Sequence, residues 1–195
     1  MHSSSFTEIE HKFLVTSDFD AHSFFKKISS LSPVKLEKIR VRDVYYVLAW
    51  DAKHVFRHRY DDQIQQLTVK SVEEDASVRT EINLPIDQSK GDQSPAVSAF
   101  MKVLGCKWSA EIAKDIEVAY FPDCEIVFYR AVGKSNAVNC VEFEAVNPKS
   151  VADGLRVLSH YESALGFNSK DREAKSLFEL LLPQDAPEDV KKMFR

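Results

Sequence analysis

The chain has 195 residues, 44% of them hydrophobic, and a formal net charge of −4. This length predicts one compact domain with a core of its own and leaves too little chain for two. The small negative charge gives no reason to expect nucleic acid or an anionic membrane as a partner. The three cysteines are odd in number and contain no CxxC pair, which indicates buried free thiols. Because no apolar run reaches about 18 residues and no secretory signal opens the chain, we expect a cytoplasmic protein.

Strands are predicted along most of the chain. Stretches rich in Val, Ile, Phe and Tyr mostly alternate in polarity, which is the period-two pattern of strands. These stretches span residues 6–15, 39–49, 54–60, 64–72, 77–84, 124–132 and 137–146. Residues 111–121, EIAKDIEVAYF, fit either an eighth strand or a helix. Because the strands follow one another through short polar turns, we expect an antiparallel sheet with flanking helices, an α+β fold.

Helices are predicted where apolar residues recur at helical spacing. One lies around residues 24–31, and the segment SPAVSAFMKVLG is expected to begin at Ser94 as the N-cap and to end at Gly105. A third covers 151–165 and ends at Gly166. A fourth covers DREAKSLFELLLP, residues 171–183, and the last dozen residues are expected to form a short helix or tail.

Charged residues occupy one face of several predicted strands, since side chains two apart in a strand share a face. The acids and bases are segregated, and the residues are Glu8, Glu10 and Lys12; Arg57 and Arg59; Lys70; Arg79 and Glu81; and Glu142 and Glu144. For any one strand, a solvated sheet face is the simpler interpretation. The segregation by strand, together with apolar opposite faces that helices can cover, favours charged faces that line a concavity instead.

Clustered glutamates in such a concavity would repel one another, by about 4 kcal/mol for a pair near 4 Å at an effective dielectric of about 20. Hard divalent cations such as Mg²⁺ or Mn²⁺ relieve this repulsion, because they bind carboxylate oxygens and complete their coordination with waters and phosphates. Arginine and lysine bind the remaining phosphate oxygens. The pattern therefore predicts a site for a metal-bound polyphosphate chain.

The sequence motifs resemble those of the CYTH domain superfamily, the triphosphate tunnel metalloenzymes, which include thiamine triphosphatase, inorganic tripolyphosphatases and class IV adenylate cyclases. EIEHK matches the opening ExExK motif of that family. Further matches follow in the family's order through residue 182: RDVYY, FRHRY, LTVK, RTE, VEFE and AKSLFELL. The resemblance implies a single tunnel domain over residues 1–182, an eight-stranded antiparallel β-barrel with flanking helices, and a tail or short helix over 183–195.

The resemblance also implies roles for individual residues. The metal ligands, for Mg²⁺ or Mn²⁺, would be Glu8, Glu10, Glu142 and Glu144, with Glu81 as a further candidate. The groups that bind a small-molecule triphosphate would be Lys12, Arg57, Arg59, Lys70 and Arg79, with Lys114 and Lys175 matching family lysines. Glu8, Glu10 and Lys12 are the expected catalytic residues. The implied reaction is hydrolysis of inorganic tripolyphosphate, thiamine triphosphate or a nucleoside triphosphate.

Several positions depart from the family pattern, among them Asn83, where an acid is common. The strand before VEFE usually carries an aspartate, but here the stretch runs from Val127 to Arg130. The usual K-x-R motif reads Lys114, Asp115, Ile116, so an arginine is replaced, and Arg130 is a candidate substitute from a neighbouring strand. Two alternatives to hydrolysis stay open: adenylate cyclase activity, and a polyphosphate- or nucleotide-binding module without catalysis.

Overall fold

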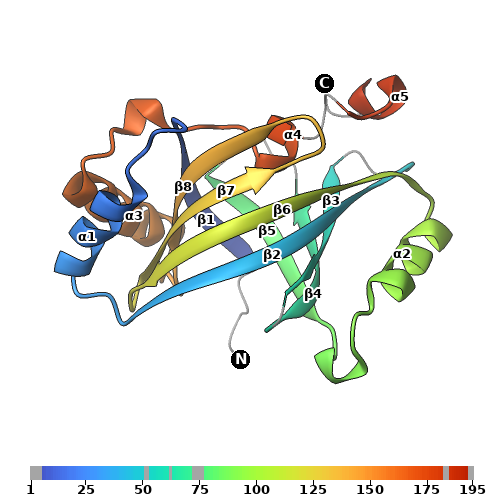
Figure 1. Ribbon diagram of the computed structural model, residues 1–195, viewed down its shortest axis with the longest axis horizontal. Coiled ribbons are helices and arrows are strands. Elements are labelled where there is room, and N and C mark those ends of the chain that lie inside the picture. Colours follow the sequence, from blue (N-terminus) through green and yellow to red (C-terminus); the bar gives the residue numbers. More distant parts are fainter. Residues whose placement is uncertain (1–5, 51–52, 62, 72–76, 182–184, 193–195) are drawn as a thin grey trace.

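Eight strands close into one antiparallel barrel in the part of the chain that the structure, a computed structural model, describes: residues 6–50, 53–61, 63–71, 77–181 and 185–192 (Figure 1). The strands are β1 (Thr7–Val15), β2 (Lys35–Leu48), β3 (His54–Tyr60), β4 (Gln65–Ser71), β5 (Val78–Pro85), β6 (Cys106–Tyr120), β7 (Cys124–Val132) and β8 (Ala137–Ala145). Their order around the barrel is β1-β5-β4-β3-β2-β6-β7-β8. The predicted α+β fold with an eight-stranded antiparallel barrel is confirmed, and the ambiguous segment 111–121 belongs to β6.

The helices lie outside the barrel wall or at its ends (Figure 1). They are α1 (Ala21–Ser30), α2 (Ser94–Val103), α3 (Val151–Leu165), α4 (Leu177–Leu181) and α5 (Glu188–Lys191), with short 3₁₀ turns at Gln88–Lys90 and Ser169–Asp171. Ser94 is the first helical residue of α2 rather than its N-cap; Gln93 holds the cap position, and the Asp92 carboxylate accepts a hydrogen bond from the Ser94 N–H.

The helix predicted over 171–183 begins later than expected, and its last two residues lie outside the described part of the chain. Residues 172 and 173 instead run along β1, where Arg172 bridges Phe13 and the Glu173 N–H donates to the Lys12 carbonyl at 2.7 Å. Helix α4 begins only after Ser176. The hydroxyl of Ser176 accepts from the Glu179 N–H at 3.2 Å, while the Glu179 carboxylate accepts from the Ser176 N–H at 2.7 Å. This reciprocal capping box fixes the start of the helix.

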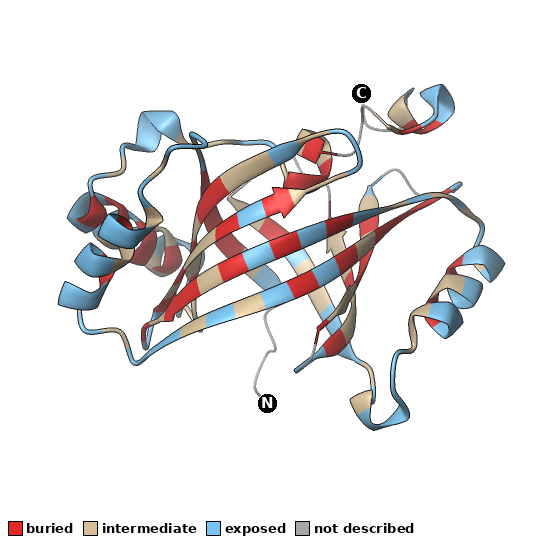
Figure 2. Cartoon of the chain, in the orientation of Figure 1, coloured by how far each residue is buried: buried red, intermediate tan, exposed pale blue. Residues whose placement is uncertain are grey.

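Two clusters of hydrophobic side chains cover the outside of the barrel. Helices α1 and α3 pack on the outer faces of β1, β7 and β8, and α2 packs on β2 and β3. Helix α3 approaches β1 closely at Gly154, where an added Cβ would stand 2.7 Å from Ile9 Cδ1. Figure 2 shows the resulting alternation of buried and exposed residues along β2 and β6.

A third cluster lies inside the barrel and closes one of its ends. Inward-facing residues such as Ile112 and Cys140 pack against Leu177, Phe178 and Leu181 of the α4 helix. Ala186, just before α5, and Val190, within α5, are buried in the same cluster. The interior is therefore blocked by hydrophobic packing at the α4 end, where β6 begins.

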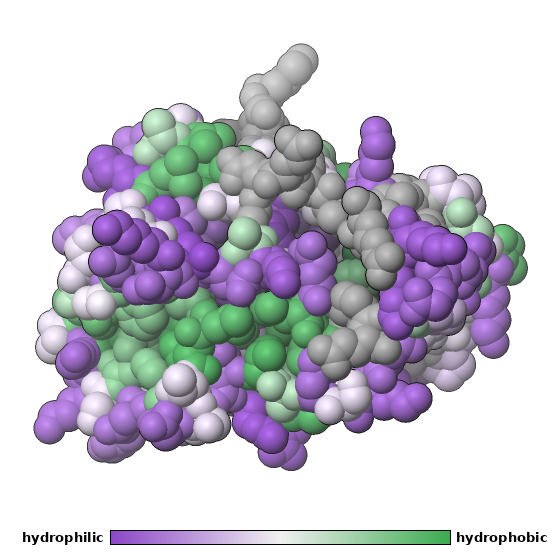
Figure 3. Space-filling model, turned by 90° about the horizontal axis from the view of Figure 1, so that it is seen from above, coloured by the Kyte–Doolittle hydropathy of each residue, from purple (hydrophilic) through white to green (hydrophobic). Residues whose placement is uncertain are grey.

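Charged side chains also cover an outer face, between β2 and β6. Lys38 pairs with Glu117 at 2.9 Å and Arg40 with Asp115 at 2.7 Å; Lys38, Arg40 and Asp115 are exposed, and Glu117 is half-buried. Hydrophobic side chains appear among hydrophilic ones on the face seen from above in Figure 3. Within the described residues, no helix is both long and apolar enough to cross a membrane. The three cysteines are free; Cys124 and Cys140 are buried, as predicted, and Cys106 is half-buried.

Candidate functional site

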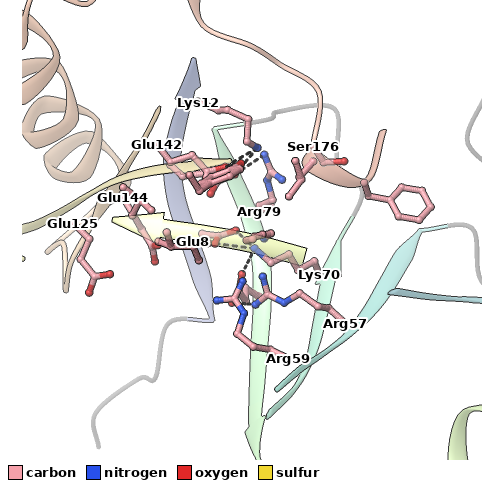
Figure 4. A pocket seen from close by; sticks show the side chains of 18 of the residues that line it. Glu8, Lys12, Arg57, Arg59, Lys70, Arg79, Glu125, Glu142, Glu144 and Ser176 are labelled. Carbon is pink, nitrogen blue, oxygen red and sulfur yellow. Dashed lines mark hydrogen bonds and ion pairs between the residues drawn. The ribbon is translucent and has the colours of Figure 1, made fainter. Parts of the chain in front are cut away.

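A cavity of about 340 Å³ occupies the barrel interior. The period-two alternation of the strands turns the predicted charged faces toward it. Figure 4 shows side chains from several strands converging there. The predicted site residues that line the cavity are Glu8, Glu10, Lys12, Arg57, Arg59, Lys70, Arg79, Glu81, Lys114, Glu142 and Glu144.

Arg130 and Lys175 are the predicted site residues that the structure leaves outside the cavity. Arg130 is exposed, because it alternates along β7 with Tyr129, which points inward. Arg130 therefore does not replace the missing arginine. Lys175 is exposed in the bend before α4, and its neighbour Ser176 lines the cavity instead.

Strand register places acids directly opposite bases. Lys12 stands opposite Glu142, and their side chains are 3.1 Å apart. Lys70 stands opposite Glu81 and binds it, and the same ammonium lies 2.9 Å from a Glu8 oxygen. Direct cross-strand pairs have the closest side chains in an antiparallel sheet, so the register itself builds these contacts.

Asp43 is a residue of the site that the sequence motifs did not assign. It is fully buried and accepts hydrogen bonds from Arg59 on Oδ1 at 2.8 Å and on Oδ2 at 2.9 Å, and Lys114 Nζ lies 2.8 Å from the same Oδ2. Burial alone would raise the pKa of this carboxyl, but Arg59 and Lys114 hold it well below its usual range. The aspartate of RDVYY, two residues before the inward-facing Tyr45, was the available signal.

Glu125 is a second site residue missed from the sequence. It lines the cavity from β7, two residues before Val127, and stands opposite Glu144 in the register. Glu144 in turn stands opposite Glu10 on β1. Three carboxylates therefore follow one another across β7, β8 and β1.

This acidic row has unusual protonation equilibria. Burial, with a further effect of Glu10, raises the pKa of Glu144 to about 8. Burial also raises the pKa of Glu125. Burial would likewise raise the pKa of Glu10, but Lys12 and Lys70 lower it to about 2. A cation between these groups would favour their ionised forms.

No group of three or more His, Cys, Asp or Glu side chains among the described residues is gathered as a ready metal site. Several of the carboxylates bind basic side chains instead, as Glu10 binds Arg79 at 3.1 Å. The donor set is nevertheless all carboxylate oxygen, which is the chemistry that Mg²⁺ and Mn²⁺ prefer. The neighbouring carboxyls Glu10, Glu144 and Glu125 fit such a cation, because its charge would favour the ionised form of Glu144, whose pKa burial and Glu10 raise.

Comparisons with known proteins bear on the fold. No protein-family model and no curated protein matches the chain. Among solved structures, the PH1012 protein of Pyrococcus horikoshii OT3 is 19% identical with a TM-score of 0.71, covering 89% of this chain and 99% of that one. A Vibrio parahaemolyticus structure described as a "putative adenylate cyclase" is 15% identical with a TM-score of 0.68, covering 89% and 96%. At these identities the likeness shows that this chain shares the fold of those structures.

The same fold also occurs outside proteins named as enzymes. A chain of the Schizosaccharomyces pombe Mediator head module is 13% identical with a TM-score of 0.58, covering 82% of this chain and 94% of that one. A shared fold at such identities does not define an activity. Function has to be argued from the side chains of the cavity.

Proposed function

We propose that this protein is a divalent-metal-dependent hydrolase of a triphosphate substrate, acting in the cytoplasm. The observation that supports the proposal is the interior arrangement of six bases and six acids around one cavity. The bases are Lys12, Arg57, Arg59, Lys70, Arg79 and Lys114, and the acids are Glu8, Glu10, Glu81, Glu125, Glu142 and Glu144. A triphosphate carries several negative charges, and arginine and lysine donors bind its oxygens from more than one side.

The bases can release their carboxylate partners to bind phosphate. Lys12 contacts both Glu10 and Glu142, and Lys70 contacts both Glu8 and Glu81. When phosphate oxygens replace those carboxylates, the glutamates become available to a cation. Bound there by Glu8, Glu10, Glu142 and Glu144, Mg²⁺ or Mn²⁺ would polarise a phosphoryl oxygen and lower the pKa of an attacking water.

Arg59 and Lys114 behave differently, because Asp43 is fully buried behind them. The two hydrogen bonds that Asp43 accepts from Arg59 hold the guanidinium plane, and its contact with Lys114 holds the ammonium. These two bases are therefore positioned before substrate arrives, which reduces the entropy lost on binding.

Adenylate cyclase activity is the second candidate. The likeness to a structure described as a "putative adenylate cyclase" favours it, although the identity is only 15%. A cyclase would hold ATP so that its ribose hydroxyl attacks the α-phosphorus. Binding without catalysis is the third candidate, and Val127 and Ile116 favour it because they occupy the stretches where the CYTH pattern has an aspartate and an arginine.

Product analysis separates these candidates. Purified protein is incubated with tripolyphosphate, ATP or thiamine triphosphate in the presence of Mg²⁺ or Mn²⁺, and free phosphate and cyclic AMP are measured. Hydrolysis predicts phosphate release that falls at least tenfold in Lys12→Gln and is kept in Lys38→Gln, an exposed lysine on the outer face of β2. Formation of cyclic AMP from ATP would identify a cyclase. Binding of a ligand without any product would support a binding module without catalysis.

A further inference from the structure

The wall of the cavity is divided into a charged part and an apolar part. Most of its charges come from β1, β3, β4, β5 and β8, whereas β2, β6 and β7 contribute neighbouring hydrophobic side chains. Ile39 stands opposite Ile116 across β2 and β6, and Val118 stands opposite Val127 across β6 and β7. Since Ile116 and Val118 are two apart on β6, these four side chains form one continuous patch, which we call the apolar wall.

The apolar wall extends toward the end of the barrel opposite α4. Tyr120, the last residue of β6, lines the same cavity and stands opposite Glu125. Its hydroxyl donates to a Glu37 oxygen at 3.2 Å, which leaves the ring half-buried at the rim. Ile64 also lines the cavity and is 43% exposed. An entering molecule therefore meets hydrophobic and aromatic surface along this side.

Inorganic polyphosphate would gain no favourable contact from such a surface. Its oxygens are charged along the whole chain, and placing them against side chains without hydrogen-bond donors is unfavourable. Ile116, two residues after Lys114 on β6, presents hydrocarbon and no hydrogen-bond donor to the cavity. A ligand with an apolar or aromatic portion gains affinity from the same contact, since burying apolar surface is favourable.

We propose that the cavity binds an organic triphosphate, whose apolar or aromatic group lies on the apolar wall and Tyr120 while its phosphates lie against the bases. This inference rests on the proposed function and narrows its substrate class. Nucleoside triphosphates and thiamine triphosphate share the required chemistry, a flat organic group joined to a triphosphate. Tripolyphosphate carries the same phosphate chain without that group.

Calorimetric titration of the full chain tests the inference. Tripolyphosphate, ATP and thiamine triphosphate are each titrated with Mg²⁺ or Mn²⁺ under one set of conditions. We expect at least one organic triphosphate to bind tenfold or more tightly than tripolyphosphate. Val127→Thr, which keeps the side-chain shape but replaces one methyl group by a hydroxyl, is expected to lower that affinity ratio at least fivefold. Val132→Thr, on the opposite face of the same strand, is expected to keep the ratio.

The outcomes separate this inference from the function on which it rests. If tripolyphosphate binds as tightly as both organic ligands, the apolar wall is only barrel packing and the inference fails while the proposed function stands. If the ratio is high but the same in Val127→Thr, the organic group lies elsewhere and the assignment of the wall is wrong. If none of the three ligands binds, the proposed function itself fails. Melting curves of both variants show whether each is folded.

Discussion

The Asp43 carboxylate accepts two hydrogen bonds from Arg59, at 2.8 and 2.9 Å, from a position without solvent exposure. The two residues stand directly opposite each other across β2 and β3. A similar contact occurs on the outside of the barrel, where Arg40 Nε donates to Asp115 at 2.7 Å across β2 and β6. The chain thus offers one buried and one exposed aspartate–arginine pair for comparison.

Asp43→Asn should be strongly destabilising and Asp115→Asn nearly neutral. Removing one charge of a buried pair leaves its partners uncompensated, at about 3 kcal/mol or more, whereas exposed pairs contribute about 0–1 kcal/mol. Urea unfolding of both variants measures the difference in unfolding free energy. Equal losses in the two variants would contradict the role given to Asp43.

Asp43→Asn is also expected to weaken triphosphate binding at least tenfold, because Arg59 and Lys114 lose the carboxylate that holds them in position.

Phe178→Ala should open the closed end of the cavity. The Phe178 ring is 4% exposed, lines the cavity and packs against Tyr45 and Trp108. Truncation of a buried phenylalanine typically costs about 3–5 kcal/mol. Phe100→Ala on α2, where the ring is 52% exposed, is the matched control and should change stability by less than about 1 kcal/mol. Thermal melting checks both; a similar small loss in each would mean that α4 does not hold this end.

The stability of the folded protein should depend on pH through Glu162. This carboxylate of α3 is buried and binds His11 of β1 at 2.5 Å and Arg172 at 2.5 Å. Burial alone would raise its pKa, but the hydrogen bonds from His11 and Arg172 leave that pKa below the ordinary value. A lowered folded-state pKa contributes stability above about pH 4.3, the unfolded value, and the contribution is lost as pH falls further.

In Glu162→Gln, the free energy of unfolding should therefore fall less steeply than in the wild type as the pH is lowered below about 4.3. We expect a loss of about 3 kcal/mol at pH 7 and a gap from wild type that narrows below about pH 4.3. Glu117→Gln, on the outer face of β6, is the control and should follow the wild-type profile. Unfolding free energies measured at several pH values check this. A gap that stays constant down to pH 3 would show that Glu162 acts only through packing.

Gly154→Ala should destabilise the contact between α3 and β1. The added methyl would stand 2.7 Å from Ile9 Cδ1, and overpacking of this kind typically costs about 1–3 kcal/mol. Ile9→Val removes that terminal methyl group. The double variant should therefore recover part of the loss of Gly154→Ala, as measured by chemical unfolding. Strict additivity of the two substitutions would contradict this packing.

Much of the fold and of the site could be predicted, because both depend on the alternation of side chains between the two faces of each strand. Alternation in EIEHK and VEFE fixes which residues share a face, and apolar residues on the other face require cover by helices. Helices α1 and α3 meet that requirement, so Glu8, Glu10, Glu142 and Glu144 face the cavity. The same rule, applied to β7, would have excluded Arg130 and found Glu125.

Other features depend on contacts that no local pattern contains. Residues 172 and 173 are extended rather than helical because Arg172 pairs with Phe13, more than 150 residues away in the chain. The burial of Asp43 depends on Arg59 and Lys114, which come from two different strands. Strand register brings these groups together, and register was not predictable from single strands.

The central claim is that the barrel interior binds a metal-bound triphosphate through its bases, and calorimetric titration of tripolyphosphate with Mg²⁺ tests it most directly. Lys12, 4% exposed between Glu10 and Glu142, is compared with Lys38, which is exposed on the outer face of β2. The account predicts saturable binding to the wild type, at least tenfold weaker binding to Lys12→Gln and wild-type binding to Lys38→Gln. No binding by the folded wild type, or equal binding by the two variants, would contradict it.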